Sequence, residues 1–400
     1  MKIQNGHLTY CTNIHPGETW PEVFKSLDYC LAVKAQVSPD KPFGIGLRLS
    51  AQAAQDLGRG TALAEFKNWL EEKDCYVFTM NGFPYGGFHN TVVKDQVHAP
   101  DWTTVERLDY TKLLFDQLSR LLPFEMEGGI STSPLSYRFW HKTEEALSAA
   151  VWDSTVHLID LVAFLARLKE RTGQSLHLDI EPEPDGILEN CGEFIDYYEH
   201  TLLGKGAAAL AKKMDISPAQ AEEHIREHIQ LCYDVCHFAV AYEDPQWVLD
   251  QLKAKDIKVG KIQISAAVKS LLKPGTVDEI KSGLLPYNES TYLHQTVFAT
   301  KDKKLAKYPD LGPALEQIDH PDYTELRTHF HVPIFTDTYG ALRSTNDEIE
   351  KVLNIWNDNP FSNHLEVETY TWGVLPENNQ LDLTASISRE LSWVLERLEQ

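Results

Sequence analysis

Residues 175–184 read SLHLDIEPEP, and this run decides the fold more than any other part of the chain. Leu178 and Ile180 alternate with Asp179 and Glu181, a period of two that predicts a strand with one apolar and one polar face. A strand of a parallel (β/α) barrel has this pattern, because its outer face packs on helices while its inner face leads to the active site at the carboxyl end. We therefore expect Leu178 and Ile180 to face outward and the two acids to face inward.

Strand-like runs of this kind recur along the chain and are separated by longer amphipathic segments. This order of elements predicts a parallel sheet covered by helices. The strand candidates are residues 6–13, 43–50, 75–82, 126–134, 175–184, 229–238, 258–265, 327–335 and 364–372. The helix candidates, which have apolar residues three and four positions apart, include residues 62–73, 111–122, 160–173 and 218–229.

The pattern predicts an α/β protein with the architecture of a (β/α)8 TIM barrel, folded as a single domain over residues 1–400. Nine candidates compete for eight places, so one of the first, seventh, eighth or ninth must lie outside the barrel. A doubly wound open sheet is the rival architecture, but its Gly-rich phosphate turn, GxGxxG, does not follow the first strand candidate. No linker rich in Pro, Gly or Ser divides the chain. Residues 266–326 have mixed signals, and we expect them to form an insertion.

The composition excludes several classes of protein. With 42% hydrophobic and 24% charged residues, the 400-residue chain can bury a large core and is neither disordered nor fibrous. A formal net charge of −22 argues against nucleic acid or anionic lipid as a partner. The first residues lack an apolar signal-peptide core and no run of about 18 apolar residues occurs, so we expect a cytoplasmic protein without membrane insertion. The six cysteines show neither disulfide nor four-cysteine zinc spacing.

The same alternation turns polar side chains inward on the later strand candidates. In residues 258–265, outward Ile262 and Ile264 leave Gln263 and Ser265 inside. The other inward residues are Asp234 beside outward Tyr233 and Val235, His329 and His331 beside outward Phe330 and Val332, and Glu366 and Glu368 beside outward Leu365 and Val367. Four strands therefore each bring an acid or an imidazole to the carboxyl end, where barrel enzymes keep their chemistry. These four residues are Glu181, Asp234, His331 and Glu368.

Three carboxylates and an imidazole form a ligand set suited to a divalent metal ion, Mn²⁺, Mg²⁺, Co²⁺ or Zn²⁺, because hard oxygens and borderline nitrogens match these ions. Buried together without a cation, the carboxylates would repel one another and raise their own pKa values. The sequence therefore predicts a metal site made by Glu181, Asp234, His331 and Glu368.

Several of these polar positions also have a purely structural interpretation. Glu183 fits a solvated loop carboxylate, Glu366 a structural salt bridge and His329 a buried core histidine. Asp234 and His237 either pair with each other or cap a following helix. The candidates for binding a polyol or sugar substrate at inner positions are Arg48, Asn81, Gln263 and His329.

The site pattern resembles that of the xylose isomerase-like barrels, a superfamily of sugar isomerases, ketose epimerases and an apurinic endonuclease. The match consists of Glu181 on the fifth strand, Asp234 with His237 on the sixth, a later His and a late Glu. The chain departs from the pattern on the seventh strand, where epimerases of the group present a His ligand and this chain reads KIQIS at 261–265. Which His completes the site therefore stays open.

A closer resemblance covers nearly the whole chain and is to the EboE family, the xylose isomerase-like member of the bacterial ebo gene cluster. The strings that carry it are GHLTYCTNIHPGETW (6–20), NGFPYGGFHNTVVKDQV (81–97), HLDIEPEPDGILEN (177–190), HFHVPIF (329–335) and LEVETYTWGVLP (365–376). The resemblance implies a barrel protein tied to the handling or export of a secondary-metabolite precursor. Other ebo cluster proteins are then its expected partners.

The leading functional hypothesis is a metal-dependent isomerase or epimerase acting on a small polar metabolite. Glu181 and Glu368 would exchange a proton with a substrate carbon from opposite sides, and His237 would orient the substrate. The alternative is a non-catalytic metabolite-binding or carrier protein on the same barrel, since a fold alone does not decide function.

Overall fold

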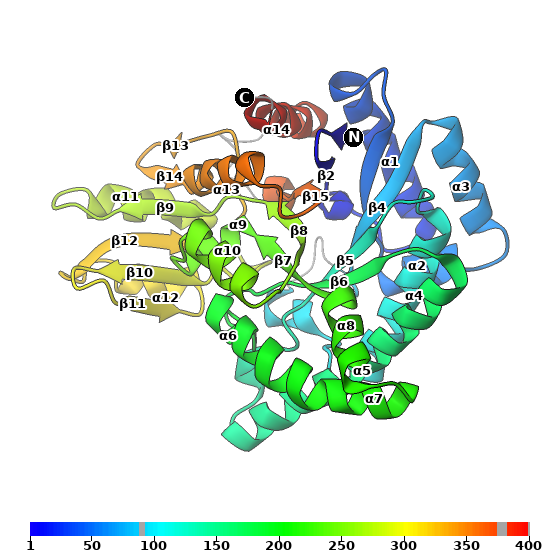
Figure 1. Cartoon of the computed structure of the whole chain (residues 1–400). Coiled ribbons are helices and arrows are strands. Elements are labelled where there is room, and N and C mark those ends of the chain that lie inside the picture. The colour runs from blue at the N-terminus through cyan, green and yellow to red at the C-terminus, as the bar shows by residue number, and fades with distance from the viewer. Residues whose placement is uncertain (88–92, 374–381, 399–400) are drawn as a thin grey trace.

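Eight parallel strands curve around a common axis in the computed structural model, which describes residues 1–87, 93–373 and 382–398 (Figure 1). In order around the barrel, they are β2 (Gly6–Tyr10), β15 (His364–Val367), β8 (Val259–Ile264), β7 (Ile229–Asp234), β6 (Leu176–Ile180), β5 (Gly128–Thr132), β4 (Cys75–Asn81) and β3 (Phe43–Arg48). Strand β1 (Lys2–Ile3) pairs antiparallel with β2. The predicted α/β barrel is confirmed.

The barrel is nearly closed, and its seam lies between β2 and β3. Here a single parallel bridge joins Cys11 and Gly46. Threonine side chains supply most of the other hydrogen bonds across the seam. The Thr9 hydroxyl donates to the Gly44 carbonyl at 2.7 Å and accepts from the Gly46 amide at 3.1 Å, while Thr12 Oγ1 accepts from the Arg48 amide at 2.8 Å.

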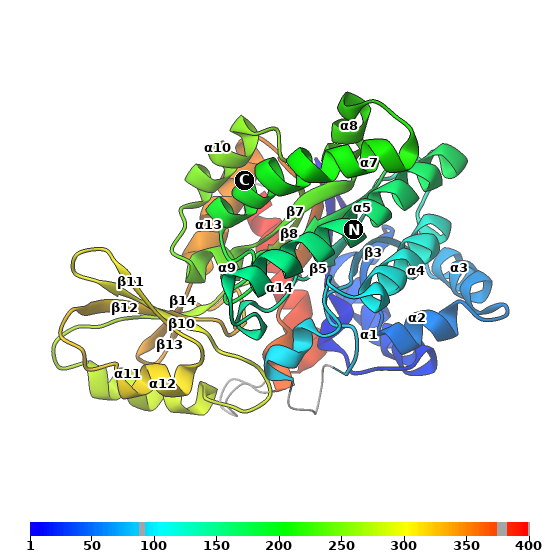
Figure 2. The same ribbon diagram turned by 90° about the horizontal axis from the view of Figure 1, so that it is seen from below.

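Helices follow the strands and cover the outside of the barrel (Figures 1 and 2). They are α1 (Trp20–Val37), α2 (Ala51–Leu57), α3 (Ala62–Glu72), α4 (Val105–Leu121), α5 (Glu144–Thr172), α6 (Cys191–Asp196), the π-helix η4 (Tyr197–Gly206), α7 (Ala207–Met214), α8 (Pro218–His228), α9 (Val235–Val240), α10 (Pro245–Ala254), α13 (Asn346–Asp358) and α14 (Leu383–Leu398). Local sequence explains their ends. Thr19 with Glu22 and Ser217 with Gln220 form capping boxes for α1 and α8, and Gly173, at φ +75°, ends α5.

Helix α5 bears on the expectation that no segment of the chain is long and apolar enough to cross a membrane. It contains an 18-residue window that is long and apolar enough, by composition, to cross a membrane. More than half of that window, 56%, is buried inside the protein. Its buried side chains, among them Leu158, Val162 and Leu165, belong to the main hydrophobic core, so the apolar character of α5 is accounted for by packing.

A second sheet interrupts the barrel between β8 and α13 and projects from one side of it (Figure 2). Its antiparallel strands, in spatial order, are β11 (Leu305–Tyr308), β10 (Thr296–Thr300), β12 (Tyr323–Thr328), β9 (Val268–Leu271), β14 (Leu342–Ser344) and β13 (Thr338–Tyr339). Helices α11 (Val277–Leu284) and α12 (Leu311–Glu316) lie within the same insertion. The insertion therefore begins where we predicted but runs to about residue 345, well beyond 326.

The strand candidate that lies outside the barrel is the eighth, residues 327–335. Only its first two residues are in a strand, β12, and residues 329–335 are irregular. The apolar residues of this segment still pack as the pattern indicated, because Phe330 and Val332 are buried in the hydrophobic core. The candidate at 229–238 was too long, since Asp234 accepts a hydrogen bond from the His237 amide at 3.1 Å and starts helix α9.

Charged side chains fill the barrel interior beneath its carboxyl end. Lys261 Nζ lies 2.7 Å from Glu366 Oε2, and both side chains are fully buried. This ion pair fulfils the structural interpretation of Glu366. His177 and Asp179 form a second buried pair, at 2.6 Å. A Cβ at Gly46 would lie 1.8 Å from Glu366 Oε1, so the absence of a side chain there makes room for the acid.

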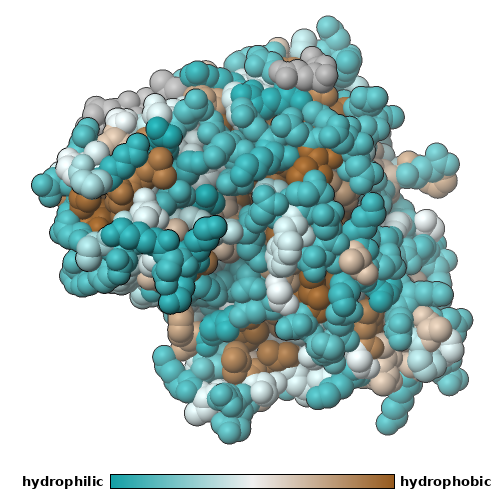
Figure 3. Space-filling model, turned by 60° about the vertical axis from the view of Figure 1, so that its left-hand side comes forward, coloured by the Kyte–Doolittle hydropathy of each residue, from teal (hydrophilic) through white to brown (hydrophobic). Residues whose placement is uncertain are grey.

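The outer surface carries its apolar residues in separate patches. On the face shown in Figure 3, hydrophobic residues lie in several small groups surrounded by hydrophilic ones. Exposed large hydrophobic residues come from distant elements, for example Phe24 on α1, Phe124 after α4 and Trp247 on α10. Such scattered positions are ordinary for a protein surface.

Candidate metal centre

Three carboxylates meet at the carboxyl end of the barrel. Glu181 follows β6, Asp234 ends β7 and Glu368 follows β15, and one oxygen from each lies within 4.8 Å of the others. All three residues are buried, and the most exposed of them, Glu368, is 4% exposed. Their convergence follows from the parallel strands, whose inner residues reach the barrel mouth at the same level.

Two imidazoles join this carboxylate cluster. His331 and His237 each offer a nitrogen within 4.8 Å of an Asp234 oxygen and of each other. His331 comes from the irregular segment after β12, so the insertion supplies this imidazole. Its Nδ1 lies 2.8 Å from the Glu368 carbonyl oxygen, a contact that places the proton on Nδ1 and leaves the lone pair on Nε2.

Three atoms of the cluster are buried without a hydrogen-bond partner: Glu181 Oε2, Asp234 Oδ2 and His331 Nε2. An unsatisfied buried polar atom costs about 1–3 kcal/mol, so three in one place call for an explanation. All three are electron-pair donors of the kind that divalent cations bind. The residues present therefore fit a divalent metal ion.

The remaining oxygens of two ligand candidates are held by the protein. Glu368 Oε1 accepts hydrogen bonds from the side-chain amides of Asn13, at 2.8 Å, and Asn81, at 3.0 Å. Asp234 Oδ1 accepts from the Ser265 hydroxyl at 2.7 Å and from the His237 amide. Such outer contacts orient ligands and leave one oxygen of each carboxylate for an ion.

The charges in the cluster are poorly balanced by the protein alone. Burial, with the charges of Glu368 and Asp234, raises the pKa of Glu181 well above its usual value, and burial with the Asp234 charge does the same for Glu368. Burial also acts to raise the pKa of Asp234, but His237 and His331 hold it below its ordinary value. Burial lowers the pKa of His331 to about 4, so its ring is neutral at neutral pH. A bound cation would relieve this repulsion.

A small cavity of about 60 Å³ lies over the cluster. Its wall combines the candidate ligands with apolar and aromatic groups: Asn13, Asn81, Phe83, Pro84, Lys94, Val97, His98, Glu181, Glu183, His237, Tyr292, Leu293, Gln295, His329, His331, Glu368 and Tyr370. Glu183, which we expected to be solvated, is instead buried and lies 2.8 Å from His98 Nε2. The Tyr370 ring packs against His331 with centroids 4.6 Å apart.

Of the four substrate-binding candidates, two line the cavity and two do not. Asn81 and His329 line the cavity. Asn81 holds Glu368, and His329 Nδ1 lies 2.9 Å from Gln295 Oε1. Arg48 is not among the lining residues and instead contacts Gly17, Glu18 and Gly86. Gln263 lies deeper in the barrel, where it accepts from the Cys232 thiol at 2.8 Å.

His237, the third catalytic candidate, stands between the carboxylates and the insertion. Its Nδ1 is 3.1 Å from the Pro182 carbonyl oxygen and 3.5 Å from Glu181 Oε1. Its Nε2 is 3.2 Å from His329 Nε2. Of the two structural alternatives for Asp234 and His237, the helix cap is realised, because Asp234 caps α9 through the His237 amide, while His237 Nε2 lies 4.0 Å from Asp234 Oδ1.

Sequence reasoning missed several residues around the cluster. Asn13 lies within the first strand candidate, residues 6–13, but the structure places it in a short 3-10 helix, Thr12–Ile14, directly after β2. Lys261 lies two residues before Gln263 on the same inner face, and its charge opposes the rise that burial causes in the pKa values of Glu181 and Glu368. Cys236 offers a sulfur within 4.8 Å of His329 and His331, a contact that no local pattern reveals.

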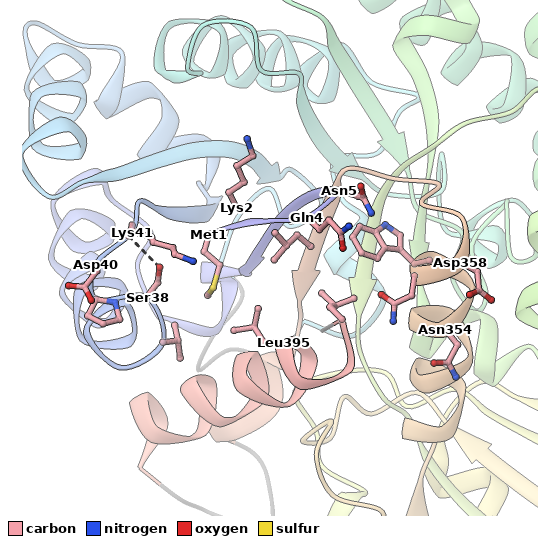
Figure 4. Close-up of a pocket in the computed structure, with 16 residues that line it drawn as sticks. Met1, Lys2, Gln4, Asn5, Ser38, Asp40, Lys41, Asn354, Asp358 and Leu395 are labelled. Carbon is pink, nitrogen blue, oxygen red and sulfur yellow. Dashed lines mark hydrogen bonds between the residues drawn. The ribbon is translucent and has the colours of Figure 1, made fainter. Parts of the chain in front are cut away.

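A much larger cavity, of about 1070 Å³, lies elsewhere. It is bounded by the N-terminal strand, the loop after α1, and helices α13 and α14 (Figure 4). Met1, Lys2, Asp40, Asp358 and Leu395 lie on its wall, and none of the metal-type clusters among the described residues includes them. Volume alone is therefore a poor guide to the chemistry of this protein.

No protein-family model matches the chain, and no curated protein matches it. Similar solved structures include a xylose isomerase-like TIM barrel protein from Mycobacterium smegmatis in complex with magnesium, with 10% identity, 98% of this chain and 96% of that chain covered, and a TM-score of 0.49. Another is the IOLI protein with a zinc atom, with 12% identity, 98% of both chains covered and a TM-score of 0.46. A third is the probable 3-DHS dehydratase AsbF from Bacillus anthracis, with 11% identity, 97% of this chain and 98% of that chain covered, and a TM-score of 0.43.

Proposed function

We propose that this protein is a metal-dependent isomerase or epimerase acting on a small polyhydroxylated or carbonyl-containing metabolite. One observation carries the proposal: three buried carboxylates and a neutral imidazole converge at the barrel mouth with unpartnered donor atoms on Glu181, Asp234 and His331. Together with Glu368, these residues would hold the ion. Mn²⁺, Mg²⁺, Co²⁺ and Zn²⁺ all accept such a ligand set.

A bound divalent ion would draw neighbouring substrate oxygens together and stabilise the negative charge that develops on them. Glu181 and Glu368 belong to strands separated by β7 and β8, so their carboxylates approach the mouth from different sides. Glu181 would exchange a proton with a substrate carbon from one of these sides. Glu368 would do the same from the other side, and His237 would orient the substrate.

The insertion belongs to the proposed site as much as the barrel does. It supplies His329 and His331, and its residues Tyr292 and Gln295 line the cavity. We therefore propose that the barrel and its insertion act as one unit. We also propose, from the sequence strings quoted above, that the chain belongs to the EboE family and handles a secondary-metabolite precursor together with other ebo cluster proteins.

The second candidate is a metabolite-binding protein that does not turn its ligand over. The cavity of about 60 Å³ has room for a few water-sized groups, so a sugar would require the aromatic wall to rearrange in either case. Both candidates need the metal and the cavity. Only the enzyme needs proton transfer to carbon.

The experiment that separates the two candidates starts with a search for the ligand. Thermal shifts of the purified protein with aldoses, ketoses and polyols, measured with Mn²⁺ and with a chelator, identify compounds that bind through the ion. A bound compound is then incubated with the protein in heavy water, and deuterium at its carbon atoms is followed by mass spectrometry. We expect uptake beside the carbonyl group, and a loss of rate of about 100-fold or more in Glu181→Gln and Glu368→Gln.

Glu183→Gln is the matched control. This carboxylate lines the same cavity but pairs with His98 and lies outside the ligand set, so the variant should keep its metal and most of its exchange rate. Wild-type protein that binds a compound tightly, takes up no deuterium and forms no isomer of it would exclude the isomerase for that compound and favour the binding protein. An unchanged rate in both Gln variants would refute the assigned roles.

A further inference from the structure

A second cluster of metal-type ligands lies at the opposite, amino-terminal end of the barrel. Glu127 directly precedes β5, His177 lies in β6 and His364 begins β15, and each offers one ligand atom within 4.8 Å of the others. His177 and His364 are four residues before Glu181 and Glu368 on the same inner faces. At about 3.3 Å per residue, the two clusters are about 13 Å apart along the strands.

The barrel is built to hold His177 in one orientation. Its Nδ1 lies 2.6 Å from Asp179 Oδ1, a carboxylate–histidine contact that leaves Nε2 as the lone-pair donor. Two glycines make room for this pair. A Cβ at Gly129 would lie 2.5 Å from His177 Cε1, and a Cβ at Gly260 would lie 1.9 Å from Asp179 Oδ1. The sequence therefore keeps side chains away from both flanks of an oriented imidazole.

His364 is fully buried, and neither of its ring nitrogens makes a hydrogen bond of ordinary geometry. Its ring lies edge-on to Phe78, with centroids 5.0 Å apart, and 5.3 Å from the His177 ring. Packing alone would be served as well by a phenyl ring, which has no polar atoms to satisfy. The Glu127 backbone offers one of these nitrogens a weak hydrogen bond, which leaves the other without a partner, and an unsatisfied nitrogen in a barrel core points to a missing partner.

Glu127 connects this cluster to solvent. One of its oxygens accepts from the Asn363 side-chain amide at 2.7 Å, which leaves the other for an ion. Glu127 and His364 both line a cavity of about 620 Å³ at this end of the barrel. Lys2, Gln4 and Asn5, which Figure 4 shows beside the cavity of about 1070 Å³, also lie on its wall. An ion therefore has a route of entry, and its fourth coordination position can face water.

We propose that Glu127, His177 and His364 bind a second divalent transition-metal ion, with Zn²⁺ as the best match. Two imidazoles, one carboxylate and an open position form a common zinc environment. The ion would tie β5 and β6 to β15 across the barrel lumen, because β7 and β8 separate β6 from β15 in the sheet. This proposal does not depend on the function proposed above.

The first test counts ions in each variant. Metal-free protein is titrated with zinc sulfate, and bound zinc is measured after dialysis by mass spectrometry. We expect two ions per chain in the wild type, one in Glu127→Gln, and one in the double variant Glu181→Gln/Glu368→Gln, which leaves only the amino-terminal site. Glu125→Gln is the matched control, since it removes a neighbouring charge on the same cavity and should keep both ions. Asp179→Asn should bind the second ion about 10- to 100-fold more weakly.

The second test produces a signal only if a metal sits in this cluster. Glu127→Cys would place a thiolate among the ligands, and Co²⁺ bound there would show a thiolate-to-metal charge-transfer band. Gln174→Cys, on the same cavity but outside the cluster, should give no such band. The proposal is overturned if Glu127→Gln binds as much zinc as the wild type, or if the folded Glu127→Cys protein gives no band beyond that of Gln174→Cys. Circular dichroism of each variant verifies its fold.

Discussion

The buried Lys261–Glu366 ion pair allows the sharpest prediction about stability. Lys261 Nζ is 2.7 Å from Glu366 Oε2 and 3.2 Å from both the Met80 carbonyl oxygen and Ser131 Oγ. Lys261→Met keeps the length of the side chain but leaves Glu366 charged in the core, where its Oε1 already has no partner. Removing one member of such a pair costs about 3–5 kcal/mol of folding free energy. We expect Glu366→Gln to cost a similar amount.

The double variant Lys261→Met/Glu366→Gln should lose less folding free energy than the two single variants lose together, because neither charge is then left unpaired. We expect a coupling energy of about 2–3 kcal/mol from the double-mutant cycle. Urea unfolding of the metal-free proteins, followed by tryptophan fluorescence and circular dichroism, gives the free energies if the two probes agree.

An exposed pair provides the control for this cycle. Lys255 lies 2.8 Å from Glu199, with 40% and 31% of the two side chains exposed. Lys255→Met should therefore cost less than about 1 kcal/mol. Strictly additive losses in the Lys261 cycle, or a Lys261→Met cost as small as that of the control, would refute the reasoning.

Three further predictions concern crowding, pH and the metal. Gly46→Ala should destabilise the fold by about 3 kcal/mol or more, because its Cβ would lie 1.8 Å from Glu366 Oε1; Gly86→Ala, where a Cβ meets nothing within 4 Å, should be nearly neutral in the same urea assay. Burial raises the pKa of Glu390 to about 8 from 4.5, so its contribution to stability is fully present below pH 4.5 and is lost as the pH rises through about 8. Glu390→Gln should flatten this decline in melting temperature between acid and alkaline pH, and a slope equal to that of the wild type would contradict the assignment. A divalent ion at 100 times its Kd should stabilise the wild type by about 2.7 kcal/mol, a gain that a chelator reverses and that Glu181→Gln/Glu368→Gln diminishes.

The inner faces of the strands could be predicted because alternation is a local property. Leu178, Ile180, Ile262 and Ile264 all lie in the hydrophobic core, as their spacing indicated. The same period placed Glu181 and Glu368 at the barrel mouth. Parallel pairing then brings these residues together without any further information from the sequence.

What the sequence did not reveal depends on contacts between distant segments. His331 sits in a run that alternates like a strand, yet Val332 donates its amide to the Ala266 carbonyl and Pro333 has no amide to extend a ladder. The eight barrel places were also already filled. The amides of Asn13 and Asn81, which meet on one oxygen of Glu368, come from opposite sides of the β2–β3 seam, so only the closed barrel shows their common role.

The hydrogen bonds at the seam between β2 and β3 affect where the barrel opens locally. A hydroxyl hydrogen bond can be exchanged for water by rotating one side chain, whereas a backbone ladder must separate along its length. The amides of Gly46 and Arg48, which donate to threonine hydroxyls, should therefore exchange with solvent deuterium sooner than the amides buried between β6 and β7. Asn13 extends directly from this seam to Glu368, so each opening would release one of the two donors that orient a carboxylate of the candidate metal centre. The seam, which a single backbone bridge and threonine hydroxyls hold together, thus lies beside the candidate metal ligands.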